Sequence, residues 1–500
     1  MKGFKDVEVA RRRYHEDGAR DSVHRAALSV PEIAGATVEI SFLNHFRLKR
    51  GYEKIGCRVT AIDGQGQRVQ SRLYPVRDAR VHTIPLTGTT GSEIASYLVE
   101  FFAAENLFIP FPAVMVNHRG AGFLNTVHAY NRVLNDVFED DAINAQAVHE
   151  ASIDVDLKPG HDTFVLFAAG MMPCRGTLEL DLVSEAGAAH ASQELDVPRF
   201  GTRWIGLKSL FGEAEHGSAA ILTVRQPSQP MFFGRLLAGQ QAADGAISAN
   251  HSYYDSSELL EYWDDTRPSC RLYPFMPGLD NRICMYPVMS PSQLDLEVSL
   301  FGTGGAILGT CPVDRLKSPG DRFAEALIDD VVADLGLAPE EVSGFALAAS
   351  PADGQAPTRI NHQLIYGRGG LDSSINVSLF NPNVFQPEGK SGFCWGQVPI
   401  GGGFDSCLGI SLNTPEIPDT EVAATFYDED GEVARRTWTM PRGSSKIIDP
   451  VAELASELGS VPSEAPLYLW YVLETERPAL SAYAVSRHAV SGHASGEHSF

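Results

Sequence analysis

The chain consists largely of short segments in which apolar and polar residues alternate. Residues 36–43, 178–183 and 294–300 show this alternation clearly. Successive side chains of a β-strand point to opposite faces of its sheet, so a period of two indicates strands with one apolar face. Turn sequences such as 62–67 and 302–305 lie between such segments and favour antiparallel hairpins. The pattern therefore predicts an all-β, mainly antiparallel chain.

Only a few segments have the pattern of a helix. The polar residues 1–34 are predicted to form an N-terminal helical segment, and residues 450–458 a short helix. The clearest helix is predicted at 322–335, because Asp321 is a suitable N-cap and Gly336 is a suitable stop. These helices are too few and too short to change the predicted fold class.

One short strand sequence recurs four times and indicates a tandem repeat. The matched residues are His128, His251, Val377 and His498, which are 123, 126 and 121 residues apart. Spacing this regular is expected when one structural unit has been copied along a chain. We therefore interpret the chain as four copies of one β-rich unit, each closing with this strand. The four closing sequences are Asn125–Tyr130, Ser248–Tyr253, Ser374–Leu379 and Ser495–Phe500.

The length supports this division, because 500 residues exceed what one hydrophobic core usually holds. A sheet with one apolar face must bury that face against another layer. Each unit is therefore predicted to be a two-layer β-sandwich of immunoglobulin-like architecture with one short helix, and a four-bladed propeller is the alternative. The predicted boundaries are 1–34 for the helical segment and 35–132, 160–256, 281–381 and 391–500 for the four units.

The acidic composition narrows the possible partners. The formal net charge is −23, and binding to nucleic acid needs a basic surface, so nucleic acid is not expected as a partner. No run of eighteen apolar residues predicts a membrane span, and residues 1–29 lack the apolar core of a secretory signal. Seven cysteines without a C-x-x-C pair argue against a disulfide framework or a structural zinc cluster. We expect a cytoplasmic protein with buried free thiols.

Two pairs of histidines ten residues apart are the main candidates for chemistry. They are His118 with His128 in the first unit and His488 with His498 in the last. If each stretch is a hairpin centred on its midpoint, the paired histidines face each other with β-carbons about 5 Å apart. Two imidazoles at that separation suit one divalent metal ion, and Glu497 is a further candidate ligand. The alternative function is therefore a metal-dependent enzyme with its site in the last unit.

A packing role explains the same histidines without a metal. In that interpretation the aromatic residue of each closing strand fills the sandwich, and the imidazole nitrogens hydrogen-bond to neighbouring loops. The hydrolase signatures G-x-S-x-G and H-E-x-x-H are missing from the sequence. We therefore prefer a non-catalytic protein without a cofactor.

The preferred function is a binding or scaffolding role. Tyr253, Trp263 and Trp395 lie near predicted loops or linkers and are candidates for stacking on a protein or glycan-like ligand. The same aromatic residues could instead join neighbouring units. Sheet edges that need covering favour self-association into a homo-oligomer. No motif in the sequence resembles a known family.

Overall fold

The structure is a computed structural model. It describes residues 24–500 except 88–92, 104–112, 129–130, 135–149, 156–159, 171–172, 185–186, 213–219, 228–231, 235, 255–261, 286–289, 317–324, 358–359 and 382–390. No described helix combines the length and the apolar character needed to cross a bilayer.

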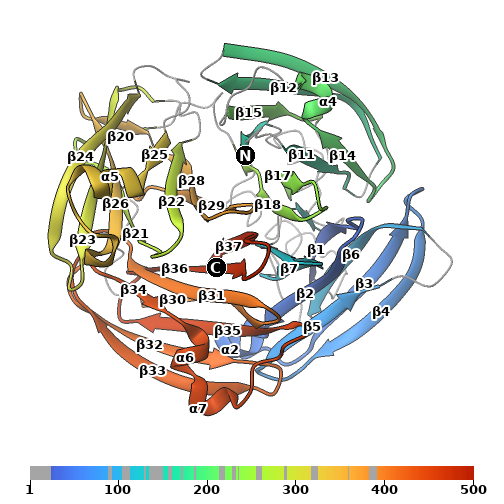
Figure 1. Ribbon diagram of the computed structural model, residues 1–500. Coiled ribbons are helices and arrows are strands. Elements are labelled where there is room, and N and C mark those ends of the chain that lie inside the picture. Colours follow the sequence, from blue (N-terminus) through green and yellow to red (C-terminus); the bar gives the residue numbers. More distant parts are fainter. Residues whose placement is uncertain are drawn as a thin grey trace, which may run out of the picture. The chain divides into compact units, whose positions relative to one another are not determined.

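The chain forms four repeats with the same strand order (Figure 1). With the eight strands of a repeat numbered along the chain, one sheet has the order 1-6-3-4 and the other has the order 5-2-7-8. The pairings are antiparallel, as between β1 and β6 or β30 and β35. The predicted all-β class and the four tandem β-sandwich units are thus confirmed.

The strands of each repeat follow in the order of the two sheets. Repeat 1 has β1 (His24–Pro31), β6 (Ile94–Ala103), β3 (Ile55–Asp63) and β4 (Arg68–Val76), then β5 (Val81–Leu86), β2 (Thr37–Leu43), β7 (Met115–Gly120) and β8 (Phe123–His128). Repeat 2 has β10 (Glu150–Val155), β15 (Ala220–Arg225), β12 (Cys174–Ser184) and β13 (Gly187–Val197), then β14 (Thr202–Gly206), β11 (His161–Ala168), β17 (Leu237–Ala242) and β18 (Ile247–His251).

Repeats 3 and 4 have the same arrangement. Repeat 3 has β21 (Ser269–Pro274), β26 (Val342–Pro351), β23 (Leu294–Gly302) and β24 (Ile307–Leu316), then β25 (Glu325–Leu327), β22 (Asp280–Met285), β28 (Asn361–Gly367) and β29 (Ser373–Ser378). Repeat 4 has β30 (Gly392–Gly401), β35 (Pro466–Thr475), β32 (Thr420–Tyr427) and β33 (Glu432–Met440), then β34 (Ser445–Ile448), β31 (Phe404–Leu412), β36 (Leu480–His488) and β37 (Ala494–His498).

Short additional elements complete the described chain. The extra strands are β9 (Asn131–Leu134), β16 (Phe232–Gly234), β19 (Tyr253–Tyr254), β20 (Tyr262–Asp264) and β27 (Gln355–Pro357). The helices are α2 (His45–Arg50), α4 (Lys208–Phe211), α5 (Ile328–Asp334), η2 (Pro339–Glu341), α6 (Pro450–Glu453) and α7 (Ala455–Leu458). In repeats 2, 3 and 4 a short helix lies between the fifth and sixth strands, which is a further sign of common design.

The predicted boundaries miss the first strand of three repeats. β1 lies in the segment predicted to be helical, and β10 and β21 lie in segments predicted to be linkers. β1 pairs with β9 on one side and β6 on the other, and Leu28, Ser29 and Val30 are all buried. A strand buried on both faces gives no alternating pattern, so its apolar residues resemble those of a helix. The helical prediction is therefore wrong for residues 24–31, and residues 1–23 lie outside the described part of the chain.

The helix predicted at 322–335 is shorter than expected. Residues 325–327 form β25, which pairs with β22, and α5 begins only at Ile328. Strand pairing of these residues thus replaces the predicted first turn, while Asp321 lies outside the described residues. Gly336 follows the helix with a φ of +67°, in the left-handed region that favours glycine.

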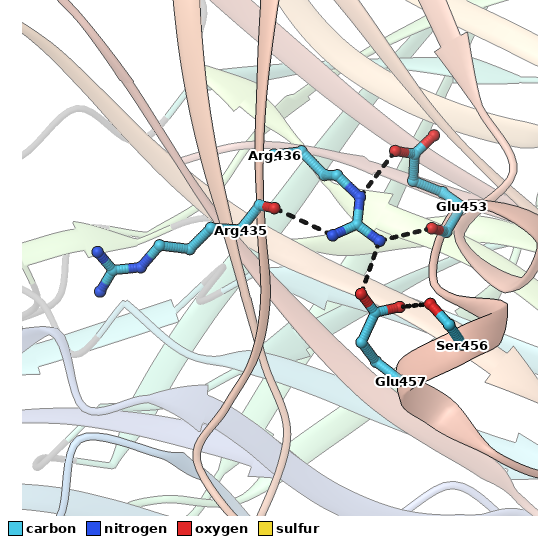
Figure 2. A network of polar contacts seen from close by, with 5 residues as sticks. All are labelled: Arg435, Arg436, Glu453, Ser456 and Glu457. Carbon is cyan, nitrogen blue, oxygen red and sulfur yellow. Dashed lines mark hydrogen bonds and ion pairs between the residues drawn. The ribbon is translucent and has the colours of Figure 1, made fainter.

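The helix predicted at 450–458 is present as α6 and α7, which meet at Leu454. Asp449 caps α6, because its side chain accepts hydrogen bonds from the backbone N–H groups of Val451 and Ala452. Arg436 on β33 joins both helices to the sheet (Figure 2). Its guanidinium donates to the Glu453 side chain and carbonyl and to the Glu457 carboxylate, at 2.9 to 3.1 Å.

The chain divides into two compact halves of two repeats each. The N-terminal half comprises residues 1–121 and 125–256, and the C-terminal half comprises 257–500 with 122–124. In the N-terminal half the Ser96 hydroxyl donates to the Phe200 carbonyl at 2.5 Å, which joins repeats 1 and 2. In the C-terminal half Leu371 N–H donates to His493 Nδ1 at 3.0 Å, which joins repeats 3 and 4.

Candidate functional site

The histidine pair predicted in repeat 4 does not form. In the β36–β37 hairpin His498 lies opposite Tyr483, and Arg487 lies opposite Ala494. The next pair outward is His488 with His493, whose carbonyl accepts the His488 N–H at 2.9 Å. The register thus differs from the predicted one by an odd number of residues, which places His488 and His498 on opposite faces.

The pair predicted in repeat 1 fails for a similar reason. β7 ends at Gly120 and β8 begins at Phe123, so the turn has two residues and is not centred on Phe123. Asn117 therefore lies opposite Thr126, whose hydroxyl donates to the Asn117 side chain at 2.8 Å. His118 and His128 consequently point to opposite faces of the hairpin. Burial lowers the pKa of His118 to about 4, which keeps its imidazole neutral.

The histidines of repeat 4 instead make local contacts. His488 Nδ1 accepts the Ser491 backbone N–H at 3.2 Å and so stabilises the hairpin loop. His498 Nδ1 donates to the Ser499 carbonyl at 2.6 Å. Glu497 is buried, and its Oε1 accepts the His498 backbone N–H at 2.9 Å and lies 3.8 Å from His498 Nε2. These bonds correspond to the packing role rather than to a two-histidine metal site in this hairpin.

The predicted stacking residues are not brought together. Tyr253 lies on β19, which pairs with β10, and Trp263 lies on β20, which pairs with β27. Trp395 on β30 is buried, and its ring contacts Phe393 and Phe500 at centroid distances of 5.3 and 5.7 Å. A buried indole cannot serve as an exposed stacking surface, but its neighbours lead to a cavity in the same half of the protein.

This cavity, called the Arg271 cavity below, lies in the C-terminal half and has a volume of about 250 Å³. Its lining includes Arg271 from β21, Cys394 from β30 and Ser481 from β36. Three phenylalanines also line the cavity, namely Phe380, Phe393 and Phe500. The first strands of repeats 3 and 4 thus contribute to one cavity, and its walls combine one cation, aromatic rings and neutral polar groups.

Arg271 is held in place by hydrogen bonds on two sides. Its Nη1 donates to the Ser378 carbonyl at 3.1 Å, and its Nη2 donates to the Ser481 hydroxyl at 2.9 Å. The Ser481 hydroxyl in turn donates to the Asn413 side chain at 2.7 Å. The guanidinium also lies over the Phe380 ring, 4.4 Å from its centroid. This network fixes the position of the positive charge.

The charge of Arg271 is not balanced by a carboxylate among the described residues. No Asp or Glu in that part of the chain lies within 4.0 Å of the guanidinium, and its Nε is buried without a hydrogen-bond partner there. The positive charge acts on nearby groups, because it adds to burial in lowering the pKa of His362 to about 3. Arg271 and Cys394 are the only titratable side chains in the lining, so the lining supplies no imidazole or side-chain carboxylate to act as a general base.

Sequence reasoning placed Arg271 in a linker. The residue lies in Ser269–Pro274, where Cys270, Leu272 and Tyr273 are all buried. Only the apolar neighbours of this arginine suggest a strand, and the cavity depends on contacts with residues more than one hundred positions away, such as Ser378 and Ser481. No local pattern reports such contacts.

Comparison with known proteins gives no family. No protein-family model matches the chain, and no curated protein is a recognisable relative. One solved structure that the search returns is described as a tetra-tandem repeat in the extending region of a large adhesion protein. It is 10% identical, covers 89% of this chain and 91% of that one, and has a TM-score of 0.11. At that TM-score the likeness carries no argument about function.

Proposed function

We propose that the chain is a non-catalytic binding protein whose Arg271 cavity holds an acidic, glycan-like ligand. The observation that carries this proposal is the guanidinium of Arg271, which is fixed in the cavity wall with no carboxylate partner among the described residues. A guanidinium presents donors in a planar fork that matches a carboxylate, so a ligand with a carboxylate would supply the missing counter-charge.

The rest of the lining suits a sugar ring. The Phe393 and Phe500 rings offer apolar surfaces for the C–H face of a pyranose, while Asn413, Thr475 and Ser481 offer neutral hydrogen-bonding groups for hydroxyls. Ligand sites usually combine apolar walls with a few placed polar groups in this way. A uronic acid has both the ring and the carboxylate that this lining would recognise.

The test is binding of glucuronate and galacturonate to the purified chain, measured by calorimetry and by saturation-transfer NMR. We expect Arg271→Met to weaken binding by about 10- to 100-fold, because a hydrogen bond to a charged group contributes about 1.5 to 3 kcal/mol. Arg271→Lys keeps the charge but loses the fork, so it should fall between the two. Glucose, which has the ring without the carboxylate, should bind more weakly than either uronate.

The matched control is Arg435→Met, because Arg435 is an exposed arginine of the same half whose side chain is paired with Glu432. Its affinity should equal that of the unchanged protein. Equal uronate affinity in Arg271→Met and Arg435→Met, with both variants folded by circular dichroism, would contradict the proposal. A protein ligand would instead have to insert an acidic side chain, and competition by an N-acetyl-glutamate peptide but not by uronates would identify that case.

A further inference from the structure

Two histidines in the N-terminal half meet although sequence spacing did not pair them. His128 is the last residue of β8 and His251 is the last residue of β18, so each ends its repeat. The rings lie edge to face with centroids 4.3 Å apart, and the residues are only 4% and 3% exposed. The Asn125 side chain accepts the Ala249 backbone N–H at 2.6 Å, which holds the two closing strands together.

The hydrogen bond of His251 leaves one ring nitrogen available as a ligand. Its Nδ1 lies 2.9 Å from the Ser252 carbonyl, and a carbonyl oxygen can only accept, so Nδ1 carries the proton. Nε2 of a neutral imidazole then has a free lone pair. Histidines that ligate metals commonly donate their other ring N–H to a backbone carbonyl in this way. His498, the matched residue of repeat 4, makes the same bond to the next carbonyl, so the arrangement belongs to the repeat.

The distance between the two side chains fits shared coordination. Candidate ligand nitrogens of His128 and His251 lie within 4.8 Å of each other. Two imidazole nitrogens at about 2.0 Å from a tetrahedral ion are about 3.3 Å apart, so small rotations of the rings bring both into range. Both imidazoles are buried, and two cationic rings in contact would repel each other, so the neutral form required of a metal ligand is also the stable form.

We propose that His128 and His251 form a binding site for a divalent transition-metal ion such as Zn²⁺, Ni²⁺ or Cu²⁺. Imidazole nitrogen is a ligand type that these ions share. The two histidines supply two positions, and water or other groups complete the coordination. The site differs from the predicted pair of His118 and His128, because the partner of His128 comes from the next repeat rather than from its own hairpin. It does not depend on the Arg271 cavity.

The first test is metal content. The full chain is dialysed against a chelator, reloaded with Zn²⁺, desalted and analysed by plasma mass spectrometry. The unchanged protein should retain an ion that both His128→Gln and His251→Gln lose. The matched control is His190→Gln, because His190 is an exposed histidine of the same half beside Asp181 and Glu179 and is the natural site for adventitious binding. The control should retain the ion.

The second test does not depend on comparing the stability of variants. Electron paramagnetic resonance of the Cu²⁺-loaded unchanged protein should show coupling to two imidazole nitrogens, and each single variant should reduce this to one or abolish it. Circular dichroism and thermal melting check that the variants remain folded. Absence of a retained ion in the unchanged protein, or an ion that only His190→Gln removes, would overturn the proposal.

Discussion

His362 is an imidazole in the hydrophobic core of the C-terminal half. The side chain is fully buried on β28, and its Nε2 is hydrogen-bonded to the Tyr273 hydroxyl. Burial, followed by the positive charge of Arg271, lowers the pKa of His362 from 6.5 to about 3. Protonation is therefore far less favourable in the folded chain than in the unfolded chain.

This shift predicts acid sensitivity in a defined range. Between about pH 6.5 and pH 3 the unfolded chain binds the proton of His362 and the folded chain does not. The contribution of His362 to the free energy of unfolding is thus complete above pH 6.5 and is lost as the pH falls toward 3. At pH 5 the loss is on the order of 2 kcal/mol. His362→Gln, which cannot protonate, should lose less stability between pH 7.5 and pH 5 than the unchanged protein.

The measurement is urea unfolding at the two pH values, followed by tryptophan fluorescence, since four of the five tryptophans lie in residues 257–500. His118→Gln is the matched control, because burial also lowers the pKa of His118, but this residue lies in the N-terminal half. It should leave the transition of the C-terminal half unchanged. The same loss on acidification in His362→Gln and in the unchanged protein would show that another group controls the acid response.

Individual residues also mark what the sequence could not predict. The closing strands with His128, His251 and His498 were correctly recognised, because the motif recurs in sequence. Their partners were not, because pairing depends on whether a hairpin turns over two residues, as at 121–122, or over four, as at 489–492. An odd error in register moves a side chain to the other face of the sheet. Candidate residues could therefore be predicted, but their juxtaposition could not.

Among the elements, the helix pair α6 and α7 depends most on one side chain. Arg436 donates hydrogen bonds to Glu453 and Glu457, and the Glu457 carboxylate accepts another from the Ser456 hydroxyl (Figure 2). The ion pair with Arg436 is half-buried, with about a quarter of each side chain exposed. Helices of four residues are unstable alone, so their position must come from contacts with the sheet.

Arg436→Met should therefore destabilise this part of repeat 4 by about 1 to 3 kcal/mol, because it leaves two carboxylates and a carbonyl without their donor. Arg435→Met is again the control, since Arg435 is mostly exposed and an exposed ion pair contributes about 0 to 1 kcal/mol. Hydrogen exchange measured by mass spectrometry over residues 450–458 should increase in Arg436→Met alone. Equal exchange in the two variants would mean that apolar packing, rather than this network, holds the helices.

Element boundaries show a second limit of sequence reasoning. Strands with a solvent-facing side, such as β12 and β23, alternate and were predicted closely. β1 has neighbours on both sides, and the short β25 is fixed by its partner β22, so neither has a local signal of its own. Such strands exist because a sheet offers them unsatisfied hydrogen-bonding groups, which is information held by the partner strands.

At the scale of the whole molecule, repeats 3 and 4 share their cores. One core cluster consists mainly of repeat 3 residues but includes Tyr483 and Val485 from β36 of repeat 4. The other consists mainly of repeat 4 residues but includes Leu272 from β21 of repeat 3. Residues buried in a neighbouring core bind the stability of the two repeats together, as is usual where repeats stack. Four sandwiches can therefore be counted from the sequence without behaving as four independent domains.

This sharing makes Leu272 the most direct probe of coupling between the repeats. Leu272 is fully buried, and replacing a buried leucine by alanine costs about 2 to 5 kcal/mol. Because its side chain packs in the repeat 4 core, Leu272→Ala should lower hydrogen-exchange protection in β31 and β35 of repeat 4 by about 30-fold or more. Leu469→Ala, within the same core but in repeat 4 itself, provides the reference pattern. Faster exchange confined to β21 and β26 in Leu272→Ala would mean that repeat 3 opens alone, and the two repeats would then be separate folding units despite their shared core.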